Sequence, residues 1–130
     1  MKLLAYEVDK RSFLGIFNED ETWVYPISAA GMEYRSMKDL IREAGPSEME
    51  MLDYISKKAP GDVTGAAPVE EIKIVSPIPE PDQDIICLGI NYMDHAEESA
   101  RFEKREFERP EKAIYFSKRV NRTNDPDGII

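Results

Sequence analysis

The first quarter of the chain alternates between apolar and polar positions, which predicts a small antiparallel sheet. Runs rich in β-branched and aromatic residues span 3–8, 13–17 and 22–26, a composition that favours strands. The polar stretches 9–11 and 18–21 separate these runs and are typical of turns. We therefore predict three short strands with short connections at the start of the chain.

The apolar spacing then changes to a helical period, and two helices are predicted to follow the strands. Ser36 can cap a helix over 37–44, because its hydroxyl can accept a hydrogen bond from the open first turn. Ser47 can cap a second helix, with Glu50 at the position that completes a capping box. The sequence Ala-Pro-Gly at 59–61 is predicted to end this second helix.

A proline-rich stretch near the middle of the chain predicts a domain boundary. Before it, 61–68 has the composition of a linker and 69–75 alternates as a strand does. Three prolines within 77–81 exclude a helix or a central strand and predict a stiff, extended connection. The predicted fold class is α+β, with a small N-terminal domain over 1–76, made of an antiparallel sheet and two helices, and a second, incomplete domain over 77–130.

The second domain is predicted to contain short buried strands over 84–88 and 113–116. Asn91 is a suitable N-cap for a helix that begins after the first of these strands. The charge-rich run 97–112 has two interpretations: a solvated helix with ion pairs between successive turns, or a mobile lid with little apolar surface to anchor it. The turn-forming residues of 121–128 predict a loop.

Composition and charge exclude several classes of protein. A length of 130 residues fits one domain, or a small domain with the start of another. A net charge of −9 disfavours nucleic-acid and anionic-membrane partners, because Lys and Arg drive both kinds of binding. No apolar run approaches the roughly 20 residues of a membrane span. The single cysteine, Cys87, excludes an internal disulfide and is interpreted as a small apolar strand residue, and a reducing, cytoplasmic location is expected.

His95 is the only histidine of the chain, and it follows an apolar run and a glycine. Glu98 lies three residues further on, so that on a helix the two side chains share one face. A carboxylate beside an imidazole favours the imidazolium form and orients the ring, as in a prepared general base. Two interpretations remain open: a catalytic acid–base pair, or two neighbouring side chains in solvent.

Pairs of acidic residues elsewhere do not predict a metal site. Glu48 and Glu50, like Glu106 and Glu108, have a spacing in sequence that resembles metal ligands. On a helix, however, residues two apart point to nearly opposite sides. The chain also lacks a glycine-rich phosphate loop, a serine nucleophile elbow and a multi-cysteine zinc motif. No metal site is therefore predicted within this chain.

The segment 87–98, Cys-Leu-Gly-Ile-Asn-Tyr-Met-Asp-His-Ala-Glu-Glu, resembles the opening of the catalytic domain of the fumarylacetoacetate hydrolase family. That family carries the motif C-x-G-x-N-Y-x-x-H-x-x-E there, and each specified position is matched. The similarity continues through the apolar run 113–116, with Lys118 at the end of an F-x-K motif, and covers about 70–130. The preceding residues look like the small α+β domain that many members carry.

The resemblance implies a metal-dependent enzyme that acts on a diketo or oxo acid by carbon–carbon hydrolysis, decarboxylation or enol isomerisation. It implies that His95 is the general base that deprotonates water, that Glu98 is its partner, and that Tyr92 and Lys118 bind substrate. Mg²⁺ or Mn²⁺, with Ca²⁺ in some members, would chelate the substrate and stabilise an enolate. The second domain is expected to be the opening strands and lid helix of a mixed β-roll, in a homodimer without nucleic-acid or membrane partners.

The metal-binding carboxylates of the family, an E-x-E pattern on a strand and a later aspartate, lie beyond residue 130 in the family pattern. We therefore expect this chain to be the N-terminal part of a longer enzyme, or a truncated product, and to be inactive alone. Two alternatives remain open: a non-enzymatic α+β module over 1–75 for interaction or dimerisation, and a truncated, inactive relative.

Overall fold

The computed structural model describes residues 1–89 and 112–129, which belong to two compact units. The first unit comprises Met1–Pro79 and Arg122–Ile130, and the second is Glu80–Asn121. The chain therefore leaves the first unit, passes through the second and returns to the first. The domain boundary expected near residue 77 stays a prediction.

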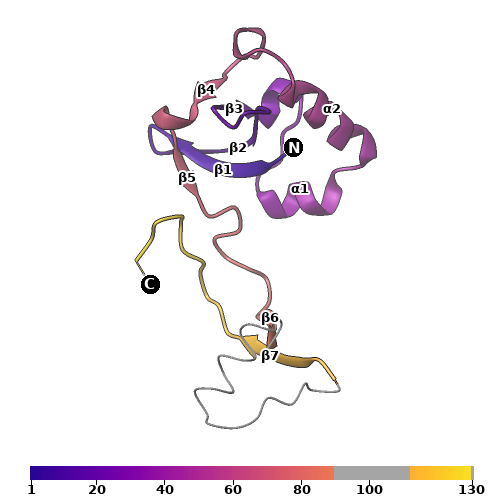
Figure 1. Ribbon diagram of the computed structural model, residues 1–130, viewed down its shortest axis with the longest axis vertical. Helices are drawn as coiled ribbons and strands as arrows, with labels where there is room; N and C mark the ends of the chain where they lie inside the picture. The colour runs from indigo at the N-terminus through magenta and orange to yellow at the C-terminus, as the bar shows by residue number, and fades with distance from the viewer. Residues whose placement is uncertain (90–111, 130) are drawn as a thin grey trace. The chain divides into compact units, whose positions relative to one another are not determined.

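The first unit is built on a curled, five-stranded antiparallel sheet with the strand order β4–β3–β2–β1–β5 (Figure 1). The three strands predicted from the apolar alternation form its centre. The α+β class, with a small antiparallel sheet and two helices, is thus confirmed in the described residues. The strands are β1 Leu3–Val8, β2 Arg11–Phe17, β3 Trp23–Pro26, β4 Ala67–Pro68 and β5 Lys73–Val75.

The two outer strands differ from the sequence-based expectation. The stretch 61–68, expected to be a linker, ends in β4, which pairs with β3 and aligns Ala67 with Val24. The strand expected over 69–75 begins instead with a 3-10 turn at Val69–Glu71, and only its last three residues form β5. Both are short edge strands, whose pairing depends on the neighbouring strand more than on their own sequence.

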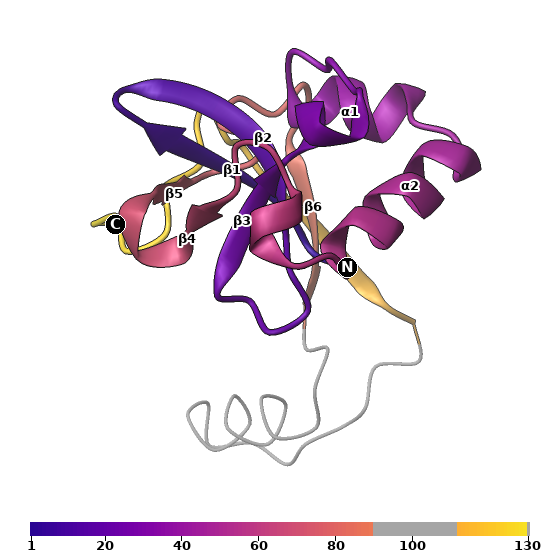
Figure 2. The same cartoon turned by 90° about the horizontal axis from the view of Figure 1, so that it is seen from above.

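Two helices, α1 Met37–Glu43 and α2 Pro46–Ser56, lie on the same side of the sheet (Figure 2). Ser36 caps α1 as predicted, and its hydroxyl accepts a hydrogen bond from the Asp39 N–H at 3.1 Å. Neither helix, nor any other helix in the described ranges, is long and apolar enough to cross a membrane. Short 3-10 turns complete the unit: η1 Ile27–Ala30, η2 Pro60–Asp62 and η3 Val69–Glu71.

The predicted start of the second helix is wrong by two residues. Gly45, not Ser47, is the N-cap, and the Glu48 carboxylate, not Glu50, accepts the N–H of the N-cap residue at 2.7 Å. Pro46 accounts for the shift, because the fixed φ of proline suits the first helical position, where no backbone N–H is needed.

The register of the strands sorts their side chains onto two faces, and α1 and α2 cover one of these. Ile16 lies opposite both Leu3 and Tyr25 on this face. These side chains pack with Leu40 of α1 and Leu52 of α2. Burial of each such large apolar side chain stabilises the fold by about 1.5–3 kcal/mol. This layer of sheet and helices is the main core of the first unit.

The other face of the sheet carries a second, smaller core of Leu4, Tyr6 and Val24. Gly15 lies in the middle of this face, opposite Leu4. A Cβ atom at Gly15 would lie 2.8 Å from the Tyr6 ring and 2.8 Å from a Val24 methyl group, so only glycine fits without a shift. The sheet is therefore apolar on both faces, and its curl encloses the smaller core together with Val69, Ile72 and Ile74.

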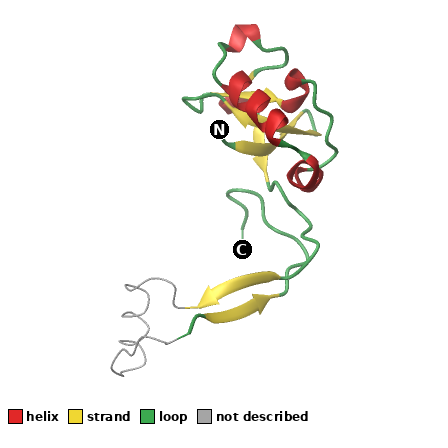
Figure 3. Ribbon diagram, turned by 90° about the vertical axis from the view of Figure 1, so that its right-hand side faces the viewer, coloured by secondary structure: helices red, strands yellow, loops and turns green. Residues whose placement is uncertain are grey.

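The described part of the second unit is a two-stranded antiparallel ribbon, β6 Ile85–Gly89 and β7 Ile114–Lys118 (Figure 3). Strands are predicted close to these positions, but as buried strands, and this burial is not found. Ile86 is 75% exposed and Tyr115 is 66% exposed. Two strands cannot cover their own faces, which need a further layer on each side. The β-roll expected here is not confirmed by these residues.

Candidate functional site

The predicted catalytic residues His95 and Glu98, and the predicted substrate-binding Tyr92, lie outside the described residues. The same holds for residues 97–111 of the helix or lid expected over 97–112. Their roles therefore stay predictions. What the structure does describe is the ribbon on which the stretch 90–111 begins and ends.

The two strands of the ribbon bring the ends of that stretch together. Gly89, the last residue of β6, pairs with Ile114, the first residue of β7. A Cβ atom at Gly89 would lie 3.4 Å from an Ile114 methyl group, so the two strands are in close contact at this end. The chain thus leaves the ribbon at Gly89 and returns to it at Ile114, the residue that pairs with Gly89, and His95 lies between them in sequence.

Lys118 is the predicted site residue that falls within the described ranges. It is exposed and pairs with Ile85, at the end of the ribbon away from Gly89. Four residue steps at about 3.3 Å separate these ends by about 13 Å. A substrate that met both Lys118 and the end where 90–113 begins would have to extend along the ribbon, and the role of Lys118 stays a prediction.

The first unit contains a cavity of about 580 Å³, which is not predicted from the sequence. Side chains of Ala5, Leu14 and Val75 line it from the helix-covered face of the sheet. Arg35 and Arg122 contribute positive charge to its lining. The lining residues come from four segments far apart in the sequence, so no local pattern marks the cavity.

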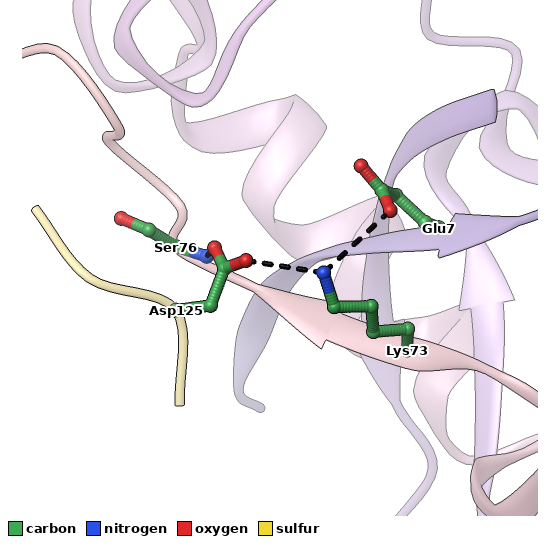
Figure 4. A network of polar contacts seen from close by, with 4 residues as sticks. All are labelled: Glu7, Lys73, Ser76 and Asp125. Atoms are coloured by element: carbon green, nitrogen blue, oxygen red, sulfur yellow. Dashed lines mark hydrogen bonds and ion pairs between the residues drawn. The ribbon is translucent and has the colours of Figure 1, made fainter. Parts of the chain in front are cut away.

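A polar network lies at one wall of this cavity (Figure 4). The Lys73 ammonium lies 3.2 Å from a carboxylate oxygen of Asp125 and 3.9 Å from one of Glu7. The second oxygen of Asp125 accepts the Ser76 N–H at 2.9 Å. This backbone hydrogen bond, followed by the one from Lys73, lowers the pKa of Asp125 below its usual value. The carboxylate is therefore held in its ionised form.

A second polar pair fixes the loop between η1 and α1, which also lines the cavity. The Tyr34 hydroxyl donates a hydrogen bond to the Glu48 carboxylate. This bond raises the pKa of Tyr34 to about 12, and the same bond is the main cause of the lowered pKa of Glu48. The carboxylate that completes the cap of α2 thus also ties the loop to that helix.

Comparison with known proteins supports the resemblance to the fumarylacetoacetate hydrolase family that segment 87–98 predicts. The relative that supports it is oxaloacetate tautomerase YisK of Bacillus subtilis (strain 168), which is 40% identical over 128 aligned residues. The match covers 91% of this chain and 41% of YisK, so the chain spans about two fifths of the length of this relative. No family model matches the chain.

Proposed function

We propose that this chain is part of an enzyme that interconverts the keto and enol forms of a small oxo acid of the oxaloacetate type. The observation that carries the proposal is the 40% identity to an oxaloacetate tautomerase over 91% of the chain. The spacing of His95 and Glu98 supports it, because tautomerisation is a proton transfer and an imidazole titrates near neutral pH.

In the proposed reaction, His95 takes the proton of the enol hydroxyl, the oxygen electron pair forms the carbonyl, and a proton is returned to the neighbouring carbon. The substrate gains and loses one proton, and no bond between heavier atoms breaks. Glu98 favours the imidazolium that exists between the two transfers and orients its ring. Tyr92 and Lys118 bind substrate, since a phenol O–H and an ammonium group both donate to carboxylate oxygens.

The divalent ion that the family resemblance implies does not fit the described residues. Within 1–89 and 112–129, no group of three His, Cys, Asp or Glu side chains could hold a metal ion. We therefore propose that the ligands for Mg²⁺, Mn²⁺ or Ca²⁺ lie outside these ranges.

The proposal includes two expectations, one about the oligomeric state of the enzyme and one about its cellular location. The apolar faces of the ribbon support a homodimer, because a second copy of the chain could cover the side chains that β6 and β7 expose. The single cysteine supports a cytoplasmic location. Sedimentation equilibrium of the complete protein tests the dimer, and a monomer at all concentrations would contradict it.

The test of the proposed function is to add oxaloacetate to the complete protein and to follow the ultraviolet absorbance of the enol as it relaxes. We expect His95→Ala to lower kcat by about 10²–10⁴-fold, the usual contribution of a general base. Carbon dioxide release and carbon–carbon hydrolysis, assayed on the same sample, test the two other reactions of the family. Relaxation at the uncatalysed rate in the wild-type protein would refute the proposal and support the non-enzymatic module.

A further inference from the structure

The cavity of about 580 Å³ in the first unit lies on a sheet face that changes from apolar to polar along the strands. The strand register places Ala5, Leu14 and Val75 in one row, which lines the cavity. The row two residues further along is polar and consists of Glu7, Ser12 and Lys73. The cavity thus has an apolar floor beside a polar margin, and its volume lies within the range of about 300–1,000 Å³ that is usual for small-molecule sites.

Two buried methionines, Met32 and Met37, extend the apolar part of the lining. Their exposed fractions are 7% and 4%, and both belong to the main core. Methionine is unbranched and polarisable, so its side chain adapts to apolar groups of different shapes. The lining therefore favours a ligand with an apolar body.

Arg35 and Arg122 add positive charge to this lining. Within the described residues, neither guanidinium group lies within 4 Å of a carboxylate oxygen. Both residues are exposed, so an anion can reach them from solvent. A guanidinium group has five N–H donors and can bind a carboxylate through two of them.

The carboxylates of the lining, in contrast, are satisfied or lie in solvent. Asp125 accepts the Ser76 N–H at 2.9 Å with one oxygen, and its other oxygen lies 3.2 Å from the Lys73 ammonium. Glu7 lies 3.9 Å from the same ammonium group, and Glu33 is exposed. The cavity thus offers donors for an anionic ligand more readily than acceptors for a cationic one.

Hydrogen bonds fix the residues on both sides of Arg35. The Tyr34 hydroxyl donates to the Glu48 carboxylate of α2. The Ser36 hydroxyl accepts the Asp39 N–H at 3.1 Å as the cap of α1. A backbone that is held before binding loses less conformational freedom when a ligand binds.

Arg122 is fixed in a similar way, at the start of the returning segment 122–130 of the first unit. The N–H of the next residue, Thr123, donates to the Pro79 carbonyl oxygen at 2.9 Å. The Thr123 hydroxyl donates to the Ile78 carbonyl oxygen at 2.8 Å. Both arginines therefore extend from backbone that is already ordered around the cavity.

We propose that this cavity is a binding site for a small carboxylate with an apolar body. The carboxylate contacts the guanidinium groups of Arg35 and Arg122, and the body lies against the apolar floor and the two methionines. The inference rests on residues of the first unit alone and does not depend on the proposed function.

Straight-chain carboxylates serve as probes, and calorimetry measures their binding to the complete protein. Acetate, butanoate, hexanoate and octanoate differ only in the length of the apolar body. We expect the affinity to rise by about two- to fourfold with each added CH₂ group, the gain expected when one CH₂ group is buried. Octanoate should bind at least about fivefold more tightly than 1-octanol or octylammonium, which lack the negative charge.

NMR spectra of methyl-labelled methionine locate the bound octanoate. The methyl signals of Met32 and Met37 should shift during the titration, because both residues line the cavity. Met51 is the internal control, because it is 46% exposed on α2 and lies outside the lining. Its signal should stay unchanged.

Two variants test the arginines, and a third provides the matched control. Arg35→Gln and Arg122→Gln should each weaken octanoate binding by at least about fivefold, with little effect on 1-octanol. Arg11→Gln makes the same change of charge at an exposed residue of β2 outside the lining, and should keep the affinity within about twofold. All three positions are exposed, so thermal unfolding should match the wild type.

Several results would overturn the proposal. Absence of octanoate binding at about 10 mM, or binding that leaves the Met32 and Met37 signals unchanged, would show that the cavity is not the site. Octanoate affinity no greater than that of 1-octanol or octylammonium would refute the carboxylate class. Equal affinities for Arg35→Gln, Arg122→Gln and Arg11→Gln would refute the role of the two arginines.

Discussion

The two units of the chain use similar apolar residues with opposite results. In the first unit, the sheet is apolar on both faces, and each face has its own buried core. In the second, the described ribbon is also apolar on both faces, yet its large side chains are exposed. The difference lies in what covers the apolar faces. In the first unit, α1 and α2 cover one face of the sheet, and the curl of the sheet encloses the smaller core on the other, whereas no described element covers the ribbon. The first unit has its own core, and the ribbon needs a covering layer from elsewhere.

Two leucines of the same size test this comparison most strongly. Leu52 in α2 is fully buried in the main core, whereas Leu88 in β6 is 46% exposed. We expect Leu52→Ala to lower the free energy of unfolding of the first unit by about 2–5 kcal/mol, because it leaves a cavity. Leu88→Ala should change it by less than about 0.5 kcal/mol. Urea unfolding of both variants makes the measurement, and equal losses would contradict the comparison.

Two glycines test the close packing of the second core. A Cβ atom at Gly15 would meet the Tyr6 ring and a Val24 methyl group at 2.8 Å, whereas one at Gly61 would meet nothing within 4 Å. We expect Gly15→Ala to destabilise the first unit by about 1–3 kcal/mol through overpacking. Gly61→Ala serves as the control and should be nearly neutral. Thermal unfolding distinguishes them, and a neutral Gly15→Ala would mean that the smaller core is loosely packed.

Two serines test the helix starts that the sequence predicts. Ser36 accepts the Asp39 N–H, so Ser36→Ala should lower the free energy of unfolding by about 1 kcal/mol. Ser47 lies inside α2, where Gly45 is the cap, so Ser47→Ala should be neutral or slightly stabilising. Urea unfolding compares the two variants. A clear loss on Ser47→Ala would restore the predicted cap.

The smallest effect concerns the returning segment at low pH. The Ser76 N–H and the Lys73 ammonium both favour the ionised form of Asp125, so its pKa in the folded state is lowered. Its contribution to stability is therefore complete above the unfolded-state pKa of about 3.9, and is lost as the pH falls through the lower folded-state value. An NMR titration of the Ser76 amide should show this step below about pH 3.9. Asp125→Asn should abolish it, and a step above that pH would contradict the assignment.

Local patterns in the sequence identify much of the first unit. Alternation locates β1, β2 and β3, and the helical period with Ser36 locates α1. The start of α2 is missed because Ser47 and Glu50 fit a capping box, whereas the actual N-cap is Gly45, whose backbone N–H donates to the Glu48 carboxylate. The choice depends on Pro46, whose preference for the first helical position outweighs the serine.

Other features depend on residues far apart in the chain and are not predicted. The edge strand β4 exists only because β3 pairs with it, and the cavity is lined by segments that meet only in the folded unit. Hydrogen bonds likewise join Ser76 with Thr123 and Asp125, which lie more than 40 residues away in sequence. The predicted catalytic site rests on the sequence motif around His95. The structure adds only that the strands before and after the stretch 90–113 pair with each other.

The most direct test of the central claim compares two adjacent carboxylates in the complete protein. Glu98 is the proposed partner of His95, whereas its neighbour Glu97 is expected to point to a different side of the same helix. We predict that Glu98→Gln lowers kcat for oxaloacetate tautomerisation by at least about tenfold, while Glu97→Gln leaves it unchanged. Equal rates for the two variants, at wild-type level, would contradict a carboxylate-supported imidazole as the catalytic base.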